Sequence, residues 1–195
     1  MVLSEPSLYH AGMLVLASQS PRRREILSWA GIEFITRPAE IPEERVAGED
    51  PCQHVRRLAR AKAEAVPAAP GEIILAADTV VVVGDHVLGK PDDEEHAAWM
   101  LGQLSGREHQ VITGICLRSP DRLVADAETT RVRFVALSEQ EITRYVKSRE
   151  PMDKAGGYAI QGLASKFIDR IEGCYFNVVG LPVALVYRHL KEWQP

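Results

Sequence analysis

The segment 73–83, which reads IILAADTVVVV, constrains the fold more than any other part of the chain. An apolar run of this length, rich in β-branched residues, is typical of a central strand. Its only charged residue is Asp78, which has ten neutral neighbours. A buried carboxylate is costly unless it meets a metal, a basic partner or backbone donors, or lies at the mouth of the strand. Although bonding to a turn would explain it structurally, the pattern favours a metal ligand or a general base.

Strands and helices alternate along the rest of the chain. The apolar patterns predict further strands at 13–17, 32–37, 86–88, 111–117, 128–135, 167–171 and 175–179. Cap and proline signals predict helices at 20–30, 50–66, 93–104, 138–147 and 181–193. Residues 150–165 form a predicted Gly-rich loop. This alternation indicates an α/β fold with a mixed sheet. A length of 195 residues suits a single domain over 13–195, with residues 1–12 as a disordered or frayed extension.

Charge and cysteine content exclude several classes of protein. The formal net charge is -4, which argues against a nucleic-acid partner. Three widely spaced cysteines without a CxxC pair predict neither a disulfide framework nor a zinc site, and they fit a reducing compartment. No apolar run approaches the roughly 20 residues of a membrane span, and no targeting segment is recognisable. We therefore expect a cytoplasmic protein without a membrane partner.

Three consecutive arginines, 22–24, follow the predicted helix start at Ser20-Pro21. The N-terminal end of a helix is already positive, so each arginine there is unfavourable by about 0.3–1 kcal/mol. A solvated basic helix end is the structural explanation. An anion held by free backbone N–H groups and guanidinium forks explains the pattern better. The small residues Ser18 and Ser20 would let such an anion approach.

Three lysines stand where apolar or loop residues would suffice. Lys62 lies in the apolar stripe of its predicted helix, where a snorkelling side chain is the structural alternative. Lys90 follows the predicted hairpin arm at 86–88, and Lys154 lies in the Gly-rich loop. Each lysine alone is a weak signal, because neither a Walker loop nor GxGxxG is present.

An acidic loop supplies a second set of candidates: Glu40, Glu43 and Glu44. A solvated loop would explain them structurally. Together with Asp78, they can provide the hard oxygen ligands that Mg²⁺ or Mn²⁺ prefers. Clustered cations facing carboxylates suit a triphosphate with a divalent metal, because the cations neutralise phosphoryl oxygens while the carboxylates hold metal or activate water.

The chain resembles the Maf family of nucleoside triphosphate pyrophosphatases. The matching stretches are LASQSPRRREIL (16–27), RLARAKA (57–63), AADTVVVV (76–83), GKP (89–91), HAAWMLGQLSGREHQVITG (96–114), EPMDKAGGYAIQG (150–162) and FNVVGLP (176–182). They span nearly the whole chain after residue 12. The resemblance implies a single α/β domain related to the inosine-triphosphate pyrophosphatase fold. It also implies a homodimer and metal-dependent cleavage between the α and β phosphates, with Mg²⁺, Mn²⁺ or Co²⁺.

The resemblance also implies roles for individual residues. Asp78 matches the catalytic proton acceptor, and Lys90 belongs to the catalytic set. Glu43 aligns with an acidic residue near the metal, with Glu44 as the alternative, so that Glu43 and Asp78 are the expected metal ligands. The expected substrate-binding residues are Ser18, Ser20, Arg22, Arg23, Lys62, Thr79, Asp153, Lys154 and Gln161.

Within the resembling family, base selectivity is tied to the positions of Arg23, Thr79 and Gln161. A subfamily that prefers dTTP and UTP carries the second arginine of SPRR and the glutamine of IQG, as this chain does. A subfamily that prefers 7-methyl-GTP has glutamate in place of that glutamine. The sequence therefore predicts a dTTP and UTP pyrophosphatase. The alternatives are a 7-methyl-GTP pyrophosphatase and a cell-division regulator that binds nucleotides without turnover.

Overall fold

The computed structural model describes residues 12–193. Seven strands form one mixed sheet in the order β2-β1-β3-β5-β6-β7, with β4 paired to β3. β1 is parallel to β2 and β3, and the other pairs are antiparallel. This arrangement confirms the expected α/β class. The strands are β1 (Met13–Leu16), β2 (Phe34–Thr36), β3 (Glu72–Val83), β4 (His86–Leu88), β5 (Glu108–Arg118), β6 (Leu123–Phe134) and β7 (Ile168–Glu172).

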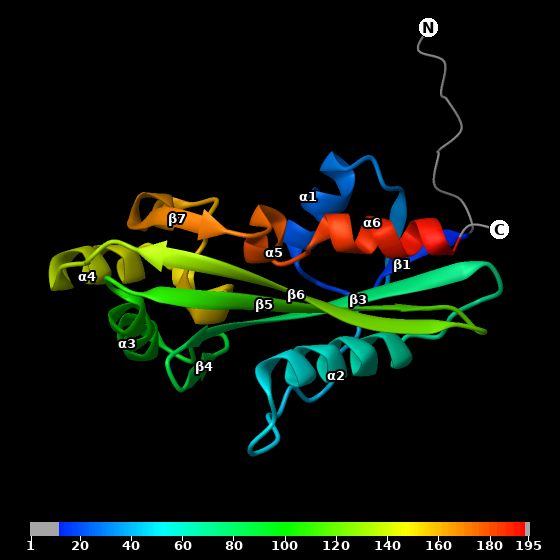
Figure 1. The fold of residues 1–195 in the computed structure, drawn as a ribbon, viewed down its shortest axis with the longest axis horizontal. Helices are drawn as coiled ribbons and strands as arrows, with labels where there is room; N and C mark the ends of the chain where they lie inside the picture. Colours follow the sequence, from blue (N-terminus) through cyan, green and yellow to red (C-terminus); the bar gives the residue numbers. More distant parts are fainter. Residues whose placement is uncertain (1–11, 194–195) are drawn as a thin grey trace, which may run out of the picture.

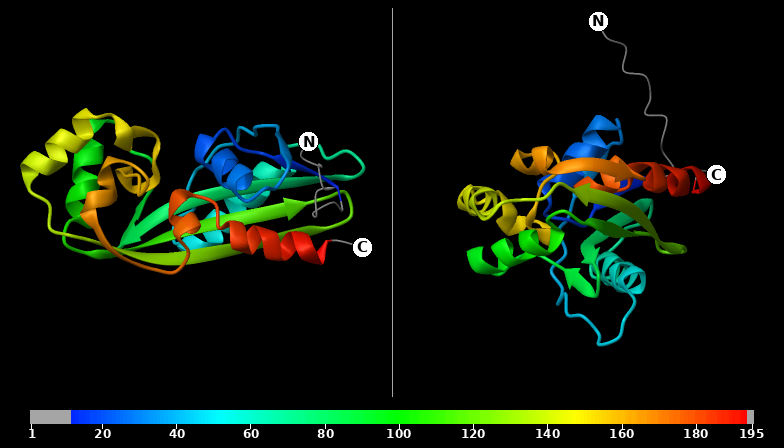
Figure 2. Two further views of the ribbon diagram at one scale, coloured as in Figure 1. Left: turned by 90° about the horizontal axis from the view of Figure 1, so that it is seen from above. Right: turned by 60° about the vertical axis from the view of Figure 1, so that its left-hand side comes forward.

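Helices cover both faces of this sheet (Figure 1). They are α1 (Pro21–Trp29), α2 (Pro51–Glu64), α3 (Glu94–Leu104), α4 (Glu139–Lys147), α5 (Tyr175–Val179) and α6 (Val183–Glu192). α2 packs on one face, where its apolar side chains meet β1 and β3. α1 and α6 share a core cluster on the opposite face. α3 and α4 gather at one end of the molecule around a separate cluster (Figure 2). The pocket described below lies among these layers.

Local capping explains where the helices begin. The Asp50 side chain accepts hydrogen bonds from the backbone N–H groups of Cys52 and Gln53, and Pro51 occupies the first turn of α2. Ser138 and Glu141 form the predicted capping box of α4. Ser20 stands at the cap position of α1 but makes no side-chain cap bond. The start of α1 is therefore left without the usual side-chain acceptor.

The prediction of a strand at 175–179 is wrong, because these residues form helix α5. A five-residue apolar run does not distinguish a strand from a buried helical turn. Tertiary contacts decide the matter here: the Asn177 side-chain amide is buried and donates to the Val111 carbonyl and to Thr130 Oγ1. Gly180 follows at φ 122° and closes the helix. The predicted loop at 150–165 also contains short 3₁₀ turns, at Glu150–Asp153 and Ala155–Gly157, and a third begins at Leu163.

Residues 1–11 lie outside the described part of the chain. The expected boundary between an extension at 1–12 and a domain at 13–195 therefore stays a prediction.

One glycine lets α2 lie directly on the sheet. Gly114 of β5 pairs in register with Asp78 of β3. A Cβ atom at Gly114 would lie 2.4 Å from the backbone C and O atoms of Val55 in α2. Backbone therefore packs against backbone beside Asp78. Because helical side chains lean toward the helix N-terminus, Lys62 of α2 is well placed to reach back to that carboxylate.

We expect Gly114→Ala to destabilise the fold by about 1–3 kcal/mol or more, because the helix backbone cannot move aside without losing its packing. Denaturant unfolding measures this change. Gly102→Ala in α3 is the matched control, since an added Cβ there meets no atom within 4 Å. That control should stabilise by about 0.5–1 kcal/mol through helix propensity. Equal stability of the Gly114→Ala variant and the unmodified protein would contradict the close approach.

Candidate active site

A cavity of about 570 Å³ opens beside the middle of β3. All twelve predicted site residues line it: Ser18, Ser20, Arg22, Arg23, Glu43, Lys62, Asp78, Thr79, Lys90, Asp153, Lys154 and Gln161. They come from the β1–α1 connection, the first turn of α1, the loop after β2, α2, β3, the segment after β4 and the turns after α4. Glu40 also lines the cavity, whereas Arg24 and Glu44 do not. Of the two alternatives in the acidic loop, Glu43 is therefore the one in the pocket.

Lys62 joins the two acidic candidates. Its Nζ atom lies 2.6 Å from Asp78 Oδ1 and 2.6 Å from Glu43 Oε1. Lys62 and Asp78 are only 8% and 6% exposed, so most of this contact is removed from water. Asp78 lies in the middle of β3 rather than at its end. Of the four explanations for a buried carboxylate, the structure has the basic partner. Lys62 is likewise bound at its charged end rather than snorkelling into solvent.

The charge around Glu43 favours its ionised form. Burial alone would raise the pKa of this carboxyl, but the ammonium of Lys62 lies against it and the charges of Lys90 and Arg23 are near. Together these cations hold the pKa of Glu43 below its ordinary value. Glu43 is thus prepared to act as an anion.

The donor set at this point fits a divalent cation. Two carboxylate oxygens converge on a single cationic atom, the Lys62 nitrogen. Within residues 12–193, no group of three or more His, Cys, Asp or Glu side chains could hold a metal by itself. Mg²⁺ is commonly held by one or two carboxylates, with phosphate oxygens and waters as its remaining ligands. Glu43 and Asp78 match that incomplete set.

Arg23 is anchored by the protein itself. Its guanidinium donates to the carbonyls of Gly180 and Ala77, and to the hydroxyls of Ser18 and Thr79. Burial lowers its pKa, although the negative charge of Asp78 opposes this effect. The Gly180 carbonyl is available to Arg23 because α5 ends there. Arg23 therefore fixes the position of Thr79 in the pocket wall.

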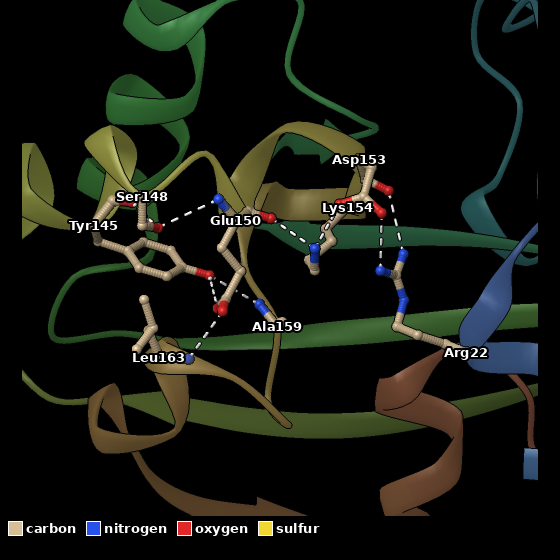
Figure 3. A network of polar contacts seen from close by, with 8 residues as sticks. All are labelled: Arg22, Tyr145, Ser148, Glu150, Asp153, Lys154, Ala159 and Leu163. Carbon is tan, nitrogen blue, oxygen red and sulfur yellow. Dashed lines mark hydrogen bonds and ion pairs between the residues drawn. The ribbon is translucent and has the colours of Figure 1, made fainter. Parts of the chain in front are cut away.

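Arg22 and Lys154 converge on Asp153 at the rim of the pocket (Figure 3). Arg22 Nη1 lies 3.0 Å from Asp153 Oδ2, and Lys154 Nζ also donates to the Glu150 carbonyl at 2.7 Å. Burial would raise the pKa of Asp153, but the two cations hold it below its ordinary value. By contrast, the side chains of Lys90 and Gln161 have no hydrogen-bonding partner within the described part of the chain. These groups can meet a ligand without first breaking a contact.

Sequence analysis did not place His54 among the site residues. His54 is 3% exposed and lines the cavity beside Leu58 and Lys62 of the same helix. Its Nδ1 lies 3.0 Å from Glu49 Oε2, and Arg57 also binds Glu49. These contacts lower the pKa of Glu49 to about 2, the hydrogen bond from Arg57 being the largest cause, and tie the acidic loop to α2. The spacing of 54, 58 and 62 along one helix face could have revealed this position.

The fold and the site together define an α/β protein with a pocket that is lined by arginine and lysine side chains and has a carboxylate pair at its base. The pattern of the Maf-like protein family matches residues 13–193, and the chain belongs to this family. This finding confirms the resemblance of its motifs.

Relatives named dTTP/UTP pyrophosphatases match almost the whole chain. The dTTP/UTP pyrophosphatase of Koribacter versatilis is 52% identical over 94% of this chain and 96% of its own length. The dTTP/UTP pyrophosphatase of Symbiobacterium thermophilum is 54% identical, over 92% and 93%. Among solved structures, the Staphylococcus aureus Ham1 protein aligns with a TM-score of 0.44 at 15% identity, covering 63% of this chain and 71% of that one.

We expect Lys62→Met to destabilise the protein by about 3–5 kcal/mol at neutral pH, because Asp78 stays buried without its counter-charge. Denaturant unfolding at neutral pH tests this. Arg60→Met is the control, since Arg60 pairs with Glu64 on the exposed face of the same helix. It should change stability by about 0.5 kcal/mol or less. A Lys62→Met variant that is as stable as Arg60→Met would contradict the assigned ion pair.

Proposed function

We propose that this protein is a nucleoside triphosphate pyrophosphatase that converts dTTP and UTP to the monophosphate and pyrophosphate. The main support for this proposal is the Lys62–Asp78 pair at the base of a cavity lined by Arg22, Lys90 and Lys154. Two relatives that match over nine-tenths of the chain bear the name of this activity. The pocket supplies both parts that such a reaction needs, cations for the phosphates and a carboxylate for water.

In the proposed mechanism, Lys90, Arg22 and Lys154 bind the triphosphate and orient its α phosphorus toward Asp78. Lys62 fixes Asp78 Oδ1, and Oδ2 has no partner within residues 12–193, so it can accept a proton from water. The water oxygen forms a bond to the α phosphorus. The bond to the bridging oxygen of the β phosphate breaks, and its electron pair leaves with pyrophosphate. The surrounding cations neutralise the charge on this leaving group.

Glu43 and Asp78 would hold the divalent metal, Mg²⁺, Mn²⁺ or Co²⁺, in this proposal. When bound, the metal neutralises phosphoryl charge and helps to orient the triphosphate. Lys62 lies against both carboxylates and keeps them facing each other.

The base would be read at the rim by Gln161, near the wall that Arg23 and Thr79 form. An amide both donates and accepts, which matches the O4 and N3–H edge of a pyrimidine. An ionised glutamate can only accept, which suits the N1–H and N2–H₂ donors of a guanine. This contrast favours dTTP and UTP over the alternative substrate, 7-methyl-GTP.

The homodimer and the cytoplasmic location stay predictions. Cys52, Cys116 and Cys174 are all free thiols, as a reducing compartment allows. No helix within residues 12–193 is long and apolar enough to cross a membrane. Light scattering on the purified protein distinguishes a dimer from a monomer of 21.6 kDa.

We expect the purified protein to release pyrophosphate from dTTP and UTP in Mg²⁺ or Mn²⁺, and a chelator to abolish this release. Asp78→Asn should lower kcat by about 10²–10⁴-fold, because the proton acceptor is lost. Asp85→Asn, in the exposed turn after the same strand, is the control. An assay that separates pyrophosphate from orthophosphate measures both. Binding without any pyrophosphate release would instead favour the nucleotide-sensing regulator, and near-normal turnover by folded Asp78→Asn would remove Asp78 from the mechanism.

Gln161→Glu should weaken turnover of dTTP and UTP more than turnover of GTP-type nucleotides, because the exchanged group can no longer donate. The measurement is kcat/KM for dTTP, UTP and 7-methyl-GTP in both proteins. We expect the ratio of kcat/KM for dTTP or UTP to kcat/KM for 7-methyl-GTP to fall by about tenfold. An unchanged ranking, or a wild type that cleaves only 7-methyl-GTP, would show that Gln161 does not select the base as proposed.

A further inference from the structure

The segment that carries Gln161 is held by a carboxylate outside the predicted site. Glu150 Oε2 accepts a hydrogen bond from the Leu163 backbone N–H at 3.1 Å. Glu150 Oε1 accepts one from the Tyr145 hydroxyl at 2.8 Å. That hydroxyl in turn accepts the Ala159 backbone N–H at 3.1 Å. The Tyr145–Glu150 pair therefore hydrogen-bonds to the backbone two residues before and two residues after Gln161 (Figure 3).

Packing in the core fixes the position of Tyr145. Tyr145 is 4% exposed, and its ring packs edge-on against Phe167 at 5.5 Å between centroids. Burial and the neighbouring Glu150 raise its pKa, so the hydroxyl keeps its proton and remains a donor. Gly162 allows the close fit, because a Cβ there would lie 2.3 Å from Glu150 Oε2. These contacts link the core around α4 to the rim of the pocket.

On the N-terminal side of Gln161 the segment is also anchored in the core, because Tyr158 and Ile160 are buried and Tyr158 bonds to His109. The backbone beyond Gln161 has no such anchor before Ala164. Residues 148–163 contain only short 3₁₀ turns, with left-handed backbone at Arg149, Gly156 and Gly157. The Gln161 side chain has no hydrogen-bonding partner within residues 12–193, so its direction depends on the backbone that carries it. Glu150 and Tyr145 supply acceptors for the backbone N–H groups of exposed Leu163 and half-buried Ala159.

We propose that Glu150 and Tyr145 are positioning residues that set base selectivity by orienting Gln161. This inference rests on the proposed role of Gln161 in base recognition. The phosphate-binding side of the pocket should be spared, because Lys154 contacts the backbone carbonyl of Glu150 rather than its carboxylate. Loss of the carboxylate should therefore affect the base and leave the triphosphate contacts unchanged.

The test measures binding, so it does not depend on turnover. Calorimetry gives Kd values for the α,β-imido analogues of dTTP and dGTP, and for tripolyphosphate, which has no base. In Glu150→Gln and Tyr145→Phe we expect the preference for the dTTP analogue to fall by about fivefold, the usual effect of one lost hydrogen bond. Tripolyphosphate affinity should stay within about twofold. Glu94→Gln is the matched control, because Glu94 pairs with exposed Arg149 nearby and should change neither value.

A double-mutant cycle establishes whether the pair acts through Gln161. In a Gln161→Ala background, Glu150→Gln should change the base preference by less than about twofold. An undiminished effect in that background, an equal loss for all three ligands, or a wild type without base preference would each overturn the inference. Failure of the proposed function looks different: no pyrophosphate is released from any nucleotide, while these binding ratios are still measured.

Discussion

The buried contact between Lys62 and Asp78 is the interaction on which the pocket depends. Two charges removed from water are tolerated only when their geometry is close, and here Nζ and Oδ1 are 2.6 Å apart. That geometry requires α2 to lie against the sheet, which Gly114 permits by leaving room for the backbone of Val55. The packing of α2 on the sheet at Gly114 thus brings Lys62 to Asp78. Glu43, from the acidic loop, also contacts Lys62.

The rim of the pocket balances its own charge in a different way. Asp153 lies between Arg22 and Lys154, whereas Arg23 is neutralised in part by carbonyl and hydroxyl oxygens. A bound anion would exchange with carboxylate at the first two cations, but it would find Arg23 already engaged. In the proposed mechanism, binding of phosphate and shaping of the wall are therefore separate tasks, divided between Arg22 and Arg23 of one helix.

The segment after α4 shows how an irregular chain can be precise. It lacks a regular ladder of backbone hydrogen bonds, so side chains supply acceptors for the N–H groups that its short turns leave open, those of Ala159 and Leu163 among them. Tyr145 packs against Phe167 in the core and hydrogen-bonds to Glu150, and this pair supplies the acceptors. The backbone carbonyl of Glu150 also accepts a hydrogen bond from Lys154. In the proposed mechanism, the phosphate contact of Lys154 and the base contact of Gln161 therefore come from one anchored segment.

The sequence by itself determined the central strand, the caps of α2 and α4, and the charged candidates of the pocket, because periodicity and misplaced charges are local signals. Asp153 and Gln161 were expected only from the family resemblance. The sequence could not determine that 175–179 is helical, since a short apolar run records burial and not geometry. Nor could it predict that Asp78 contacts Lys62 or that His54 lines the cavity. Those outcomes depend on which helix covers which strand, and only tertiary packing decides that, because the partners are distant in the chain and meet through a close backbone approach.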